Sequence, residues 1–229
     1  MSAPDSTLLD STLPDATSPS PAPPVIKQPP ALWVVVGLGN PGQEYADTPH
    51  NLGFRVIARL AEQAGIRVTR PEARSLTGVG EMEGRRVVLA TPLTYMNLSG
   101  GAVKELLKKY EAGKEALLLV FDELSLPFGS IRIRERGSAG GHNGVESVID
   151  GVGSPEFTRI RLGIAPDRPV SPEHKAAYVL KAFPKSWKEP AEELVDRGVE
   201  AVRMLLRDGV ARAMNEFNRR EPPVERELK

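Results

Sequence analysis

Three polar side chains of this sequence, His50, Asp122 and Asn40, are of the types that together activate a water molecule. Asp122 directly follows the apolar run 117–121, where a carboxylate loses its hydration and needs a partner, and His50 is the obvious candidate. A carboxylate that accepts from one imidazole nitrogen fixes the tautomer and leaves the second nitrogen free to take a proton from water. Asn40 adds an uncharged amide. The combination predicts general-base chemistry, whereas His50 alone would fit a hydrogen bond within its own loop equally well.

The loop 37–51, which contains the candidate base, permits a second interpretation. It follows the apolar run 32–36, which is typical of a strand covered on both faces, and its glycines satisfy the G-x-G-x-x-G pattern of dinucleotide-binding turns. In that pattern the third glycine lies inside an opening helix, but here Pro41 precedes it. The acidic residue that should bind the ribose about 20 residues later is missing, because Glu62 falls within a predicted helix. A dinucleotide-binding oxidoreductase is therefore the least favoured alternative.

The composition indicates one domain. The chain has 229 residues, 40% hydrophobic content and zero formal net charge, so it can bury one core and has no global field to attract an anionic partner. Without cysteine it has no disulfide scaffold or thiol chemistry, and three histidines leave little material for a metal centre. Residues 1–30 hold eight prolines and five serines, which predicts a disordered extension before a catalytic domain at 31–229.

The extension does not resemble a targeting segment. It lacks the basic start and apolar core of a secretory signal, and its three aspartates and single lysine argue against a transit peptide. No later stretch approaches the length of a membrane span. We therefore expect a cytoplasmic protein.

Two alternating segments could supply a local basic surface. In 131–134 and 159–162, alternation sends the aliphatic side chains to one face of a strand and the arginines to the other. This pattern predicts four arginines on exposed strand faces, where they could bind nucleic acid phosphates. Solvated strand faces with surface ion pairs would produce the same pattern.

The order of the periodic segments predicts the fold class. Strands that alternate with helices, plus one hairpin, indicate an α/β protein: a single three-layer domain with a twisted mixed β-sheet flanked by helices. The expected elements are a strand at 32–36, a helix at about 49–64, strands at 76–82 and 85–90 joined at 83–84, a helix capped by Ser99, a strand at 117–121, and a largely helical C-terminal third interrupted at Gly209.

This fold would bring the candidate residues together. In open α/β sheets, sites form beyond the carboxyl ends of strands. Here three predicted strands are followed by Asn40, the segment 94–97 and Asp122. We therefore expect these polar groups to converge on one rim of the sheet.

The candidate base is expected at the start of a helix. Thr48 suits an N-cap and Pro49 suits the first helical position, which puts His50 in the first turn. The partial positive charge of a helix start disfavours an imidazolium ion, so the ring should be neutral and able to accept a proton.

Four separate motifs, taken in order, resemble those of one enzyme family. They are VGLGNPG at 36–42 with Tyr45 and TPHN at 48–51, then YMNLSG at 95–100, then DEL at 122–124 with LP at 126–127, and then GSAGGHNG at 137–144. They closely resemble bacterial-type peptidyl-tRNA hydrolase over about residues 33 to 218. The resemblance implies an esterase that cleaves the bond between a nascent peptide and the 3′-terminal ribose of tRNA, recycling tRNA from aborted translation. It also implies that peptidyl-tRNA is the partner, that no metal or organic cofactor is needed, and that the protein does not act at a membrane. We also expect a monomer.

The resemblance also assigns roles by position. His50 matches the family's catalytic base, Asp122 the carboxylate that orients it, and Asn40 the amide that holds the reacting ester or its oxyanion. The remaining matches concern binding: the substrate-binding amides Asn97 and Asn143, the walls of the peptide and terminal-adenosine site Tyr45, Met96, Gly140 and Gly141, and the arginines Arg134 and Arg161, which fall where the family binds the tRNA 5′ phosphate.

One position departs from the family pattern. Pro49 stands where the family usually has arginine, so one positive charge near the site is absent and its effect on tRNA affinity is open. His142 is expected to shape its loop or lie at the rim rather than to act as a second base, and His174 to be an exposed loop residue. The non-enzymatic alternative is an RNA-binding module that keeps the binding groove but performs no chemistry.

Overall fold

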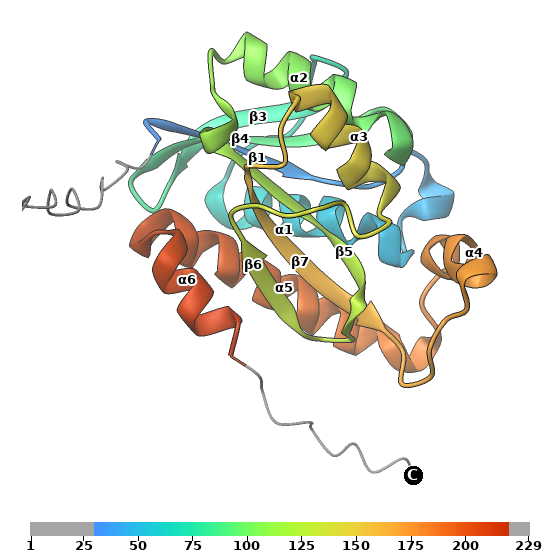
Figure 1. Cartoon of the computed structure of the whole chain (residues 1–229). Coiled ribbons are helices and arrows are strands. Elements are labelled where there is room, and N and C mark those ends of the chain that lie inside the picture. Colours follow the sequence, from blue (N-terminus) through green and yellow to red (C-terminus); the bar gives the residue numbers. More distant parts are fainter. Residues whose placement is uncertain (1–29, 220–229) are drawn as a thin grey trace, which may run out of the picture.

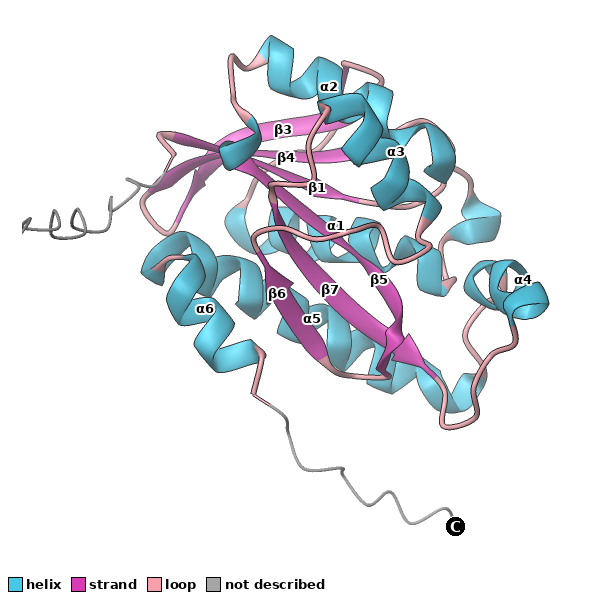
Figure 2. Ribbon diagram, in the orientation of Figure 1, coloured by secondary structure: helices cyan, strands magenta, loops and turns pink. Residues whose placement is uncertain are grey.

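The computed structural model describes residues 30–219 of the chain. Figure 1 shows the described residues coloured in sequence order, and Figure 2 distinguishes helices, strands and loops. The extension predicted over residues 1–30 lies, apart from Pro30, outside the described residues.

The strands of this part of the chain form one mixed seven-stranded sheet in the order β2-β3-β4-β1-β5-β7-β6. The central pairs β1–β4, β1–β5 and β5–β7 are parallel, while β2–β3, β3–β4 and β6–β7 are antiparallel. The strands are β1 (Leu32–Gly37), β2 (Arg70–Glu72), β3 (Ser75–Met82), β4 (Arg85–Pro92), β5 (Leu117–Pro127), β6 (Ile131–Arg134) and β7 (Thr158–Ala165).

Helices connect and cover the strands. Among the described helices, none combines the length and apolar composition needed to cross a bilayer. The α-helices are α1 (Leu52–Ala64), α2 (Ser99–Lys109), α3 (Asn143–Val152), α4 (Lys175–Leu180), α5 (Lys185–Asp208) and α6 (Val210–Phe217). Short 3₁₀ turns are η1 (Gln43–Tyr45), η2 (Pro49–Asn51), η3 (Met96–Leu98), η4 (Lys114–Ala116) and η5 (Pro172–His174).

The sheet separates two apolar cores. Residues of α1, α5 and α6 pack on one face, and residues of α2 and α3 pack on the other, as the two helical layers in Figure 2 show. In β1, Trp33 and Val35 join the first core while Val34 and Val36 join the second. The continuous apolar run of β1 follows from this two-sided burial, and the three-layer α/β fold predicted from the sequence is confirmed.

The predicted hairpin is present. β3 ends at Met82, β4 begins at Arg85, and the two residues between them, Glu83 and Gly84, have φ angles of 51° and 71°. Positive φ at both central positions is typical of the type I′ turn, whose twist suits a two-residue hairpin. Gly209 likewise interrupts the C-terminal helical run where the sequence predicted a break, between α5 and α6.

Two helix starts differ from the prediction. Ser99 is the first residue of α2 rather than its cap, which is Leu98, and the Ser99 hydroxyl has no hydrogen-bond partner among the described residues. Thr48 precedes η2 as expected, but its hydroxyl donates to the Tyr45 carbonyl at 2.8 Å instead of capping the helix. At α2 the 3₁₀ turn η3 precedes Ser99, so the chain is already wound before the expected cap. Thr48 does stand at the cap position of η2, but its side chain makes no capping bond.

The glycine pattern after β1 reflects close packing. A Cβ on Gly37 would lie 2.2 Å from the carbonyl oxygen of Gly53 in α1, so only glycine allows the strand end and the helix to approach this closely. Gly42 precedes the three-residue turn η1 rather than lying within a helix that could hold a pyrophosphate. The G-x-G-x-x-G pattern here therefore has a packing explanation that involves no nucleotide.

Candidate active site

His50 and Asp122 form a buried hydrogen-bonded pair. His50 lies in the middle of η2 and Asp122 in β5, and the His50 Nδ1 atom is 2.9 Å from Asp122 Oδ1. The Asp122 side chain is 1% exposed and that of His50 11%. Because an ionised carboxylate can only accept, Nδ1 of His50 carries the proton, and Nε2 keeps a free lone pair. The sequence prediction that these two side chains meet is thus fulfilled, although β5 runs on to Pro127 and Asp122 lies within the strand.

The electrostatics of the pair keep Asp122 ionised. Burial by itself would raise the pKa of Asp122, but its interactions with two imidazoles, those of His50 and His142, outweigh this effect and hold the pKa well below its usual range. A carboxylate that stays charged throughout the neutral range can stabilise a positive charge that develops on His50 when the ring takes up a proton.

Asn40 is fixed by contacts with two other segments. Its backbone N–H donates to Asn51 Oδ1 at 2.9 Å, and its carbonyl accepts from Asn51 Nδ2 at 2.9 Å. Its side-chain oxygen accepts from the backbone N–H of Met96 at 2.8 Å. These bonds assign the orientation of the amide and leave Asn40 Nδ2 as a donor for another group. The sequence placed Asn51 in the TPHN motif beside His50 but gave it no role.

His142 takes part in the same hydrogen-bonded group. It is the N-cap of α3, and its Nδ1 accepts from the backbone N–H groups of Gly144 at 3.1 Å and Val145 at 3.3 Å. Its Nε2 lies 3.1 Å from Asp122 Oδ1, and its ring centroid is 4.8 Å from that of His50. The expected loop-shaping role agrees with the cap, but the contact with Asp122 was missed.

The residues expected to bind substrate lie on the connections around these groups. Asn97 is exposed in η3, and Asn143 is exposed as the first residue of α3. Met96 is buried, and its sulfur lies so close to Gly144 that a Cβ there would be 2.3 Å from it, which joins η3 to the start of α3. The other candidates are Tyr45, half-buried at the end of η1, and Gly140 and Gly141, with φ angles of 60° and 83° in the loop before α3.

The four arginines of β6 and β7 do not all lie on an exposed face, contrary to the prediction. Alternation places them opposite the aliphatic residues, but Arg159 is 1% exposed and donates to the carbonyls of Gly137, Ser138 and Pro155. Its burial lowers its pKa to about 10, with Arg161 adding to the shift. The loop before α3 covers this position, which strand alternation cannot reveal.

The two arginines expected at the tRNA phosphate differ in their contacts. Arg161 donates from Nε and Nη2 to the same Glu123 oxygen, at 2.9 and 2.8 Å. Arg134 is partly exposed at the end of β6 and makes no ion pair with any described residue. In the β6–β7 register Arg132 lies opposite Arg161, and Arg134 lies opposite Arg159.

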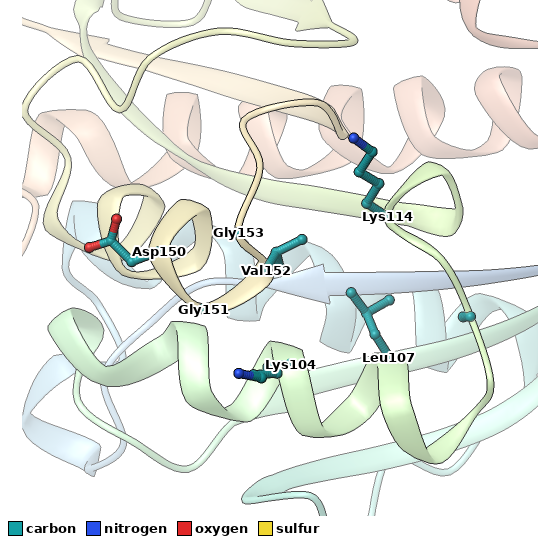
Figure 3. A pocket seen from close by; sticks show the side chains of 8 residues that line it. Lys104, Leu107, Lys114, Asp150, Gly151, Val152 and Gly153 are labelled. Atoms are coloured by element: carbon teal, nitrogen blue, oxygen red, sulfur yellow. The ribbon is translucent and has the colours of Figure 1, made fainter.

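Two of the pockets in the described part of the chain lie near the candidate residues or between the helices of one layer. One of about 390 Å³ borders the site, because Asn40 and Asn51 line it together with Phe54 and Arg55. Another, of about 420 Å³, lies between α2 and α3 beside Lys104 and the C-terminal end of α3 (Figure 3). None of the polar groups bonded to Asp122 lines this second pocket.

The described residues offer one group that could be considered for a metal ion. Ligand atoms of His50, Asp122 and His142 lie within 4.8 Å of one another. However, an ionised Asp122 can only accept, so both imidazole nitrogens nearest it act as hydrogen-bond donors and present no lone pair to an ion. The geometry is that of a hydrogen-bonded group.

Comparison with known proteins identifies the family. A family model described as "Peptidyl-tRNA hydrolase" matches residues 34–225. The chain belongs to the peptidyl-tRNA hydrolase family. A relative of that name from Koribacter versatilis is 51% identical over 193 residues, which cover 84% of this chain and 95% of the relative. Another of that name, from Bacillus subtilis, is 45% identical over 185 residues, which cover 81% of this chain and 97% of the relative.

Solved structures of this family share the fold. The crystal structure of peptidyl-tRNA hydrolase from Acinetobacter baumannii superposes with a TM-score of 0.77 at 37% identity, covering 84% of this chain and 97% of that chain. The peptidyl-tRNA hydrolase resemblance read from the four sequence motifs is thereby confirmed.

Proposed function

We propose that this member of the peptidyl-tRNA hydrolase family hydrolyses the ester bond between the peptide and the tRNA in peptidyl-tRNA, with His50 as general base. The observation that carries the proposal is the hydrogen bond between His50 Nδ1 and Asp122 Oδ1, which leaves Nε2 free to accept. Family membership supports the substrate class. The protein would act in the cytoplasm, where translation takes place, as a monomer that recycles tRNA from aborted translation.

The proposed reaction needs one base and one oxyanion donor. Nε2 of His50 takes a proton from water while the water oxygen attacks the ester carbonyl carbon, and Asp122 stabilises the imidazolium ion that forms. The side-chain oxygen of Asn40 accepts from the Met96 N–H, so the Asn40 Nδ2 group is available to donate. It donates a hydrogen bond to the negative oxygen of the tetrahedral intermediate. When the intermediate collapses, the bond to the ribose 3′-oxygen breaks and that oxygen takes the proton from His50.

Asparagine side chains supply the proposed peptide selectivity. Asn97 and Asn143, exposed on adjoining connections, would bond the peptide backbone, while Tyr45, Met96, Gly140 and Gly141 would form the walls around it. Amides suit a neutral peptide group, because they both donate and accept without charge. A free aminoacyl-tRNA presents a cationic amine at the same place and would bind poorly.

Arg134 of β6 and Arg161 of β7 would bind the tRNA acceptor end. Arg134, which has no ion-pair partner among residues 30–219, would contact the 5′ phosphate directly. Arg161 would join it only by sharing its guanidinium between the phosphate and Glu123. Pro49 is buried and would add no charge to these contacts.

Paired hydrolysis assays test the proposal. The wild-type protein should release deacylated tRNA from N-acetyl-aminoacyl-tRNA and hardly at all from free aminoacyl-tRNA. His50→Ala should slow release by about 100-fold or more, the usual contribution of a positioned general base, with an unchanged circular dichroism spectrum. Binding of both substrates without turnover would favour the non-catalytic RNA-binding module, and a wild-type rate in His50→Ala would eliminate His50 as the base.

A further inference from the structure

The contacts of His142 permit one protonation state of its ring. Backbone N–H groups can only donate, so the Nδ1 atom that faces Gly144 and Val145 must be an acceptor and carries no proton. A proton on Nδ1 would face two N–H groups at the positive end of α3 and would break the cap. The neutral ring therefore carries its proton on Nε2.

This tautomer makes His142 a donor to Asp122. Nε2–H points at Asp122 Oδ1, 3.1 Å away, which is the same oxygen that accepts from His50 Nδ1 at 2.9 Å. One carboxylate oxygen thus receives two imidazole donors. The His142 side chain is 8% exposed, so water can do little to replace its hydrogen bond.

We propose that His142 is a positioning residue that sets the proton affinity of His50, an inference that rests on the proposed hydrolysis. A neutral donor on Asp122 Oδ1 takes up part of the carboxylate's negative charge, so less of that charge is available to favour the protonated form of His50. The two backbone N–H groups at Nδ1 also hold the His142 ring in the tautomer and orientation that donate to Asp122. Removal of the His142 donor should therefore raise the pH at which the hydrolytic activity declines on the acid side.

Other charged groups on the surrounding elements are engaged elsewhere or exposed. Within β5, Glu123 is bonded to Arg161 of β7, so its charge is paired. Two further groups form ion pairs with α5: Asp47 before η2 with Lys188, and Arg55 of α1 with Glu192. The other two, Glu146 of α3 and Lys175 of α4, are exposed. His142 is therefore the group best placed to modulate the His50–Asp122 pair.

Two isosteric variants separate the two functions of the His142 ring. Asparagine is a favoured N-cap whose oxygen can accept from the backbone N–H groups of Gly144 and Val145, so His142→Asn keeps the cap and loses the donor to Asp122. Glutamine places its amide nitrogen near the position of Nε2, so His142→Gln keeps the donor and loses the cap. Each variant loses one hydrogen-bonding function of the ring, so thermal melts of both serve as the folding control.

The decisive measurement is the pH profile of kcat/KM for N-acetyl-aminoacyl-tRNA hydrolysis. In His142→Asn the acid limb should move to higher pH by about one unit, the size expected when a hydrogen bond to a charged group is removed. In His142→Gln the limb should stay within about 0.3 units of wild type, well below that shift. An unchanged limb in His142→Asn, or equal shifts in both variants, would overturn the proposal.

A double-mutant cycle and an NMR titration complete the test. In an Asp122→Asn background the carboxylate charge is gone, so adding His142→Asn should no longer move the limb; a full shift there would also overturn the proposal. Following the His50 imidazole resonances through a pH titration gives the same comparison without turnover. A protein that hydrolyses no substrate would contradict the proposed function, whereas an NMR titration midpoint of His50 that is unchanged by His142→Asn would contradict only this inference.

Discussion

Replacement of Asp122 by asparagine should preserve the orientation of His50 while removing the charge beside it. Both imidazole donors converge on Oδ1, so an amide oxygen at that position can accept both bonds. The NH₂ group then takes the place of Oδ2, which neither imidazole contacts. The tautomer of His50 with its proton on Nδ1 is therefore retained, and the loss of activity should come from electrostatics alone.

The size of that loss can be worked from the geometry. With Nδ1 2.9 Å from Oδ1 and the imidazolium charge spread over the ring, the mean separation of the two charges is about 4 Å. At an effective dielectric constant of about 20 their attraction is about 4 kcal/mol, which corresponds to a factor of about 1,000 in rate if the whole of it is lost in the transition state. We expect kcat to fall about 100- to 1,000-fold, and the acid limb to move to lower pH because the protonated form of His50 has lost its anion.

The matched control is Asp122→Ala, which removes the acceptor as well as the charge. Without an acceptor the imidazole is no longer held, and kcat should fall about tenfold further, the equivalent of one net hydrogen bond. Steady-state hydrolysis of N-acetyl-aminoacyl-tRNA between pH 5 and 9, with near-ultraviolet circular dichroism as the folding control, checks both variants. An Asp122→Asn enzyme no faster than Asp122→Ala, or an acid limb moved to higher pH, would refute the reasoning from the shared oxygen.

Three other properties can be measured directly. Because the pKa of Asp122 lies below its ordinary value of 3.8, the ionised carboxylate stabilises the fold above pH 3.8. Wild type should therefore have a larger free energy of unfolding than Asp122→Asn. Urea titrations should show this difference shrinking as the pH falls below 3.8. Arg134→Ala should weaken full-length tRNA binding and reduce the slope of log affinity against log salt by about one unit, with no effect on a 3′-end fragment that lacks the 5′ phosphate. Gly100→Ala should lower the free energy of unfolding by about 1–3 kcal/mol, because its Cβ would lie 1.7 Å from the Ser147 carbonyl oxygen. Thermal melts measure this loss. The control is Gly101→Ala, whose Cβ would meet only the flexible end of the Arg74 side chain.

The sequence predicted the parts of the fold that depend on local patterns. Continuous apolar runs identified β1 and β5, and a two-residue turn identified the hairpin. The rule that sites form beyond the carboxyl ends of strands predicted the meeting of His50 and Asp122, which are 72 positions apart, although β5 runs on to Pro127 and Asp122 lies within it. These inferences succeeded because each depends on strand direction and burial, which hydrophobic patterns record.

The helix α3 was not predicted, for a reason visible in its packing. It contains Gly144 and Gly151, and glycine weakens the helical signal of a sequence. A Cβ on Gly151 would lie 2.4 Å from the Gly100 carbonyl oxygen, and one on Gly144 would meet the sulfur of Met96. The same close contacts that require glycine therefore hide the helix, and with it the capping position of His142.

Asn40 has a consequence for the design of inhibitors. Its backbone is held by Asn51 and its side-chain oxygen by Met96, so the remaining N–H donor is immobilised before any ligand arrives. A compound that presents a negatively charged or strongly polarised oxygen there would bind with little loss of conformational entropy in the Asn40 side chain. Rigid transition-state mimics should accordingly gain more affinity at this position than flexible copies of the ground-state ester.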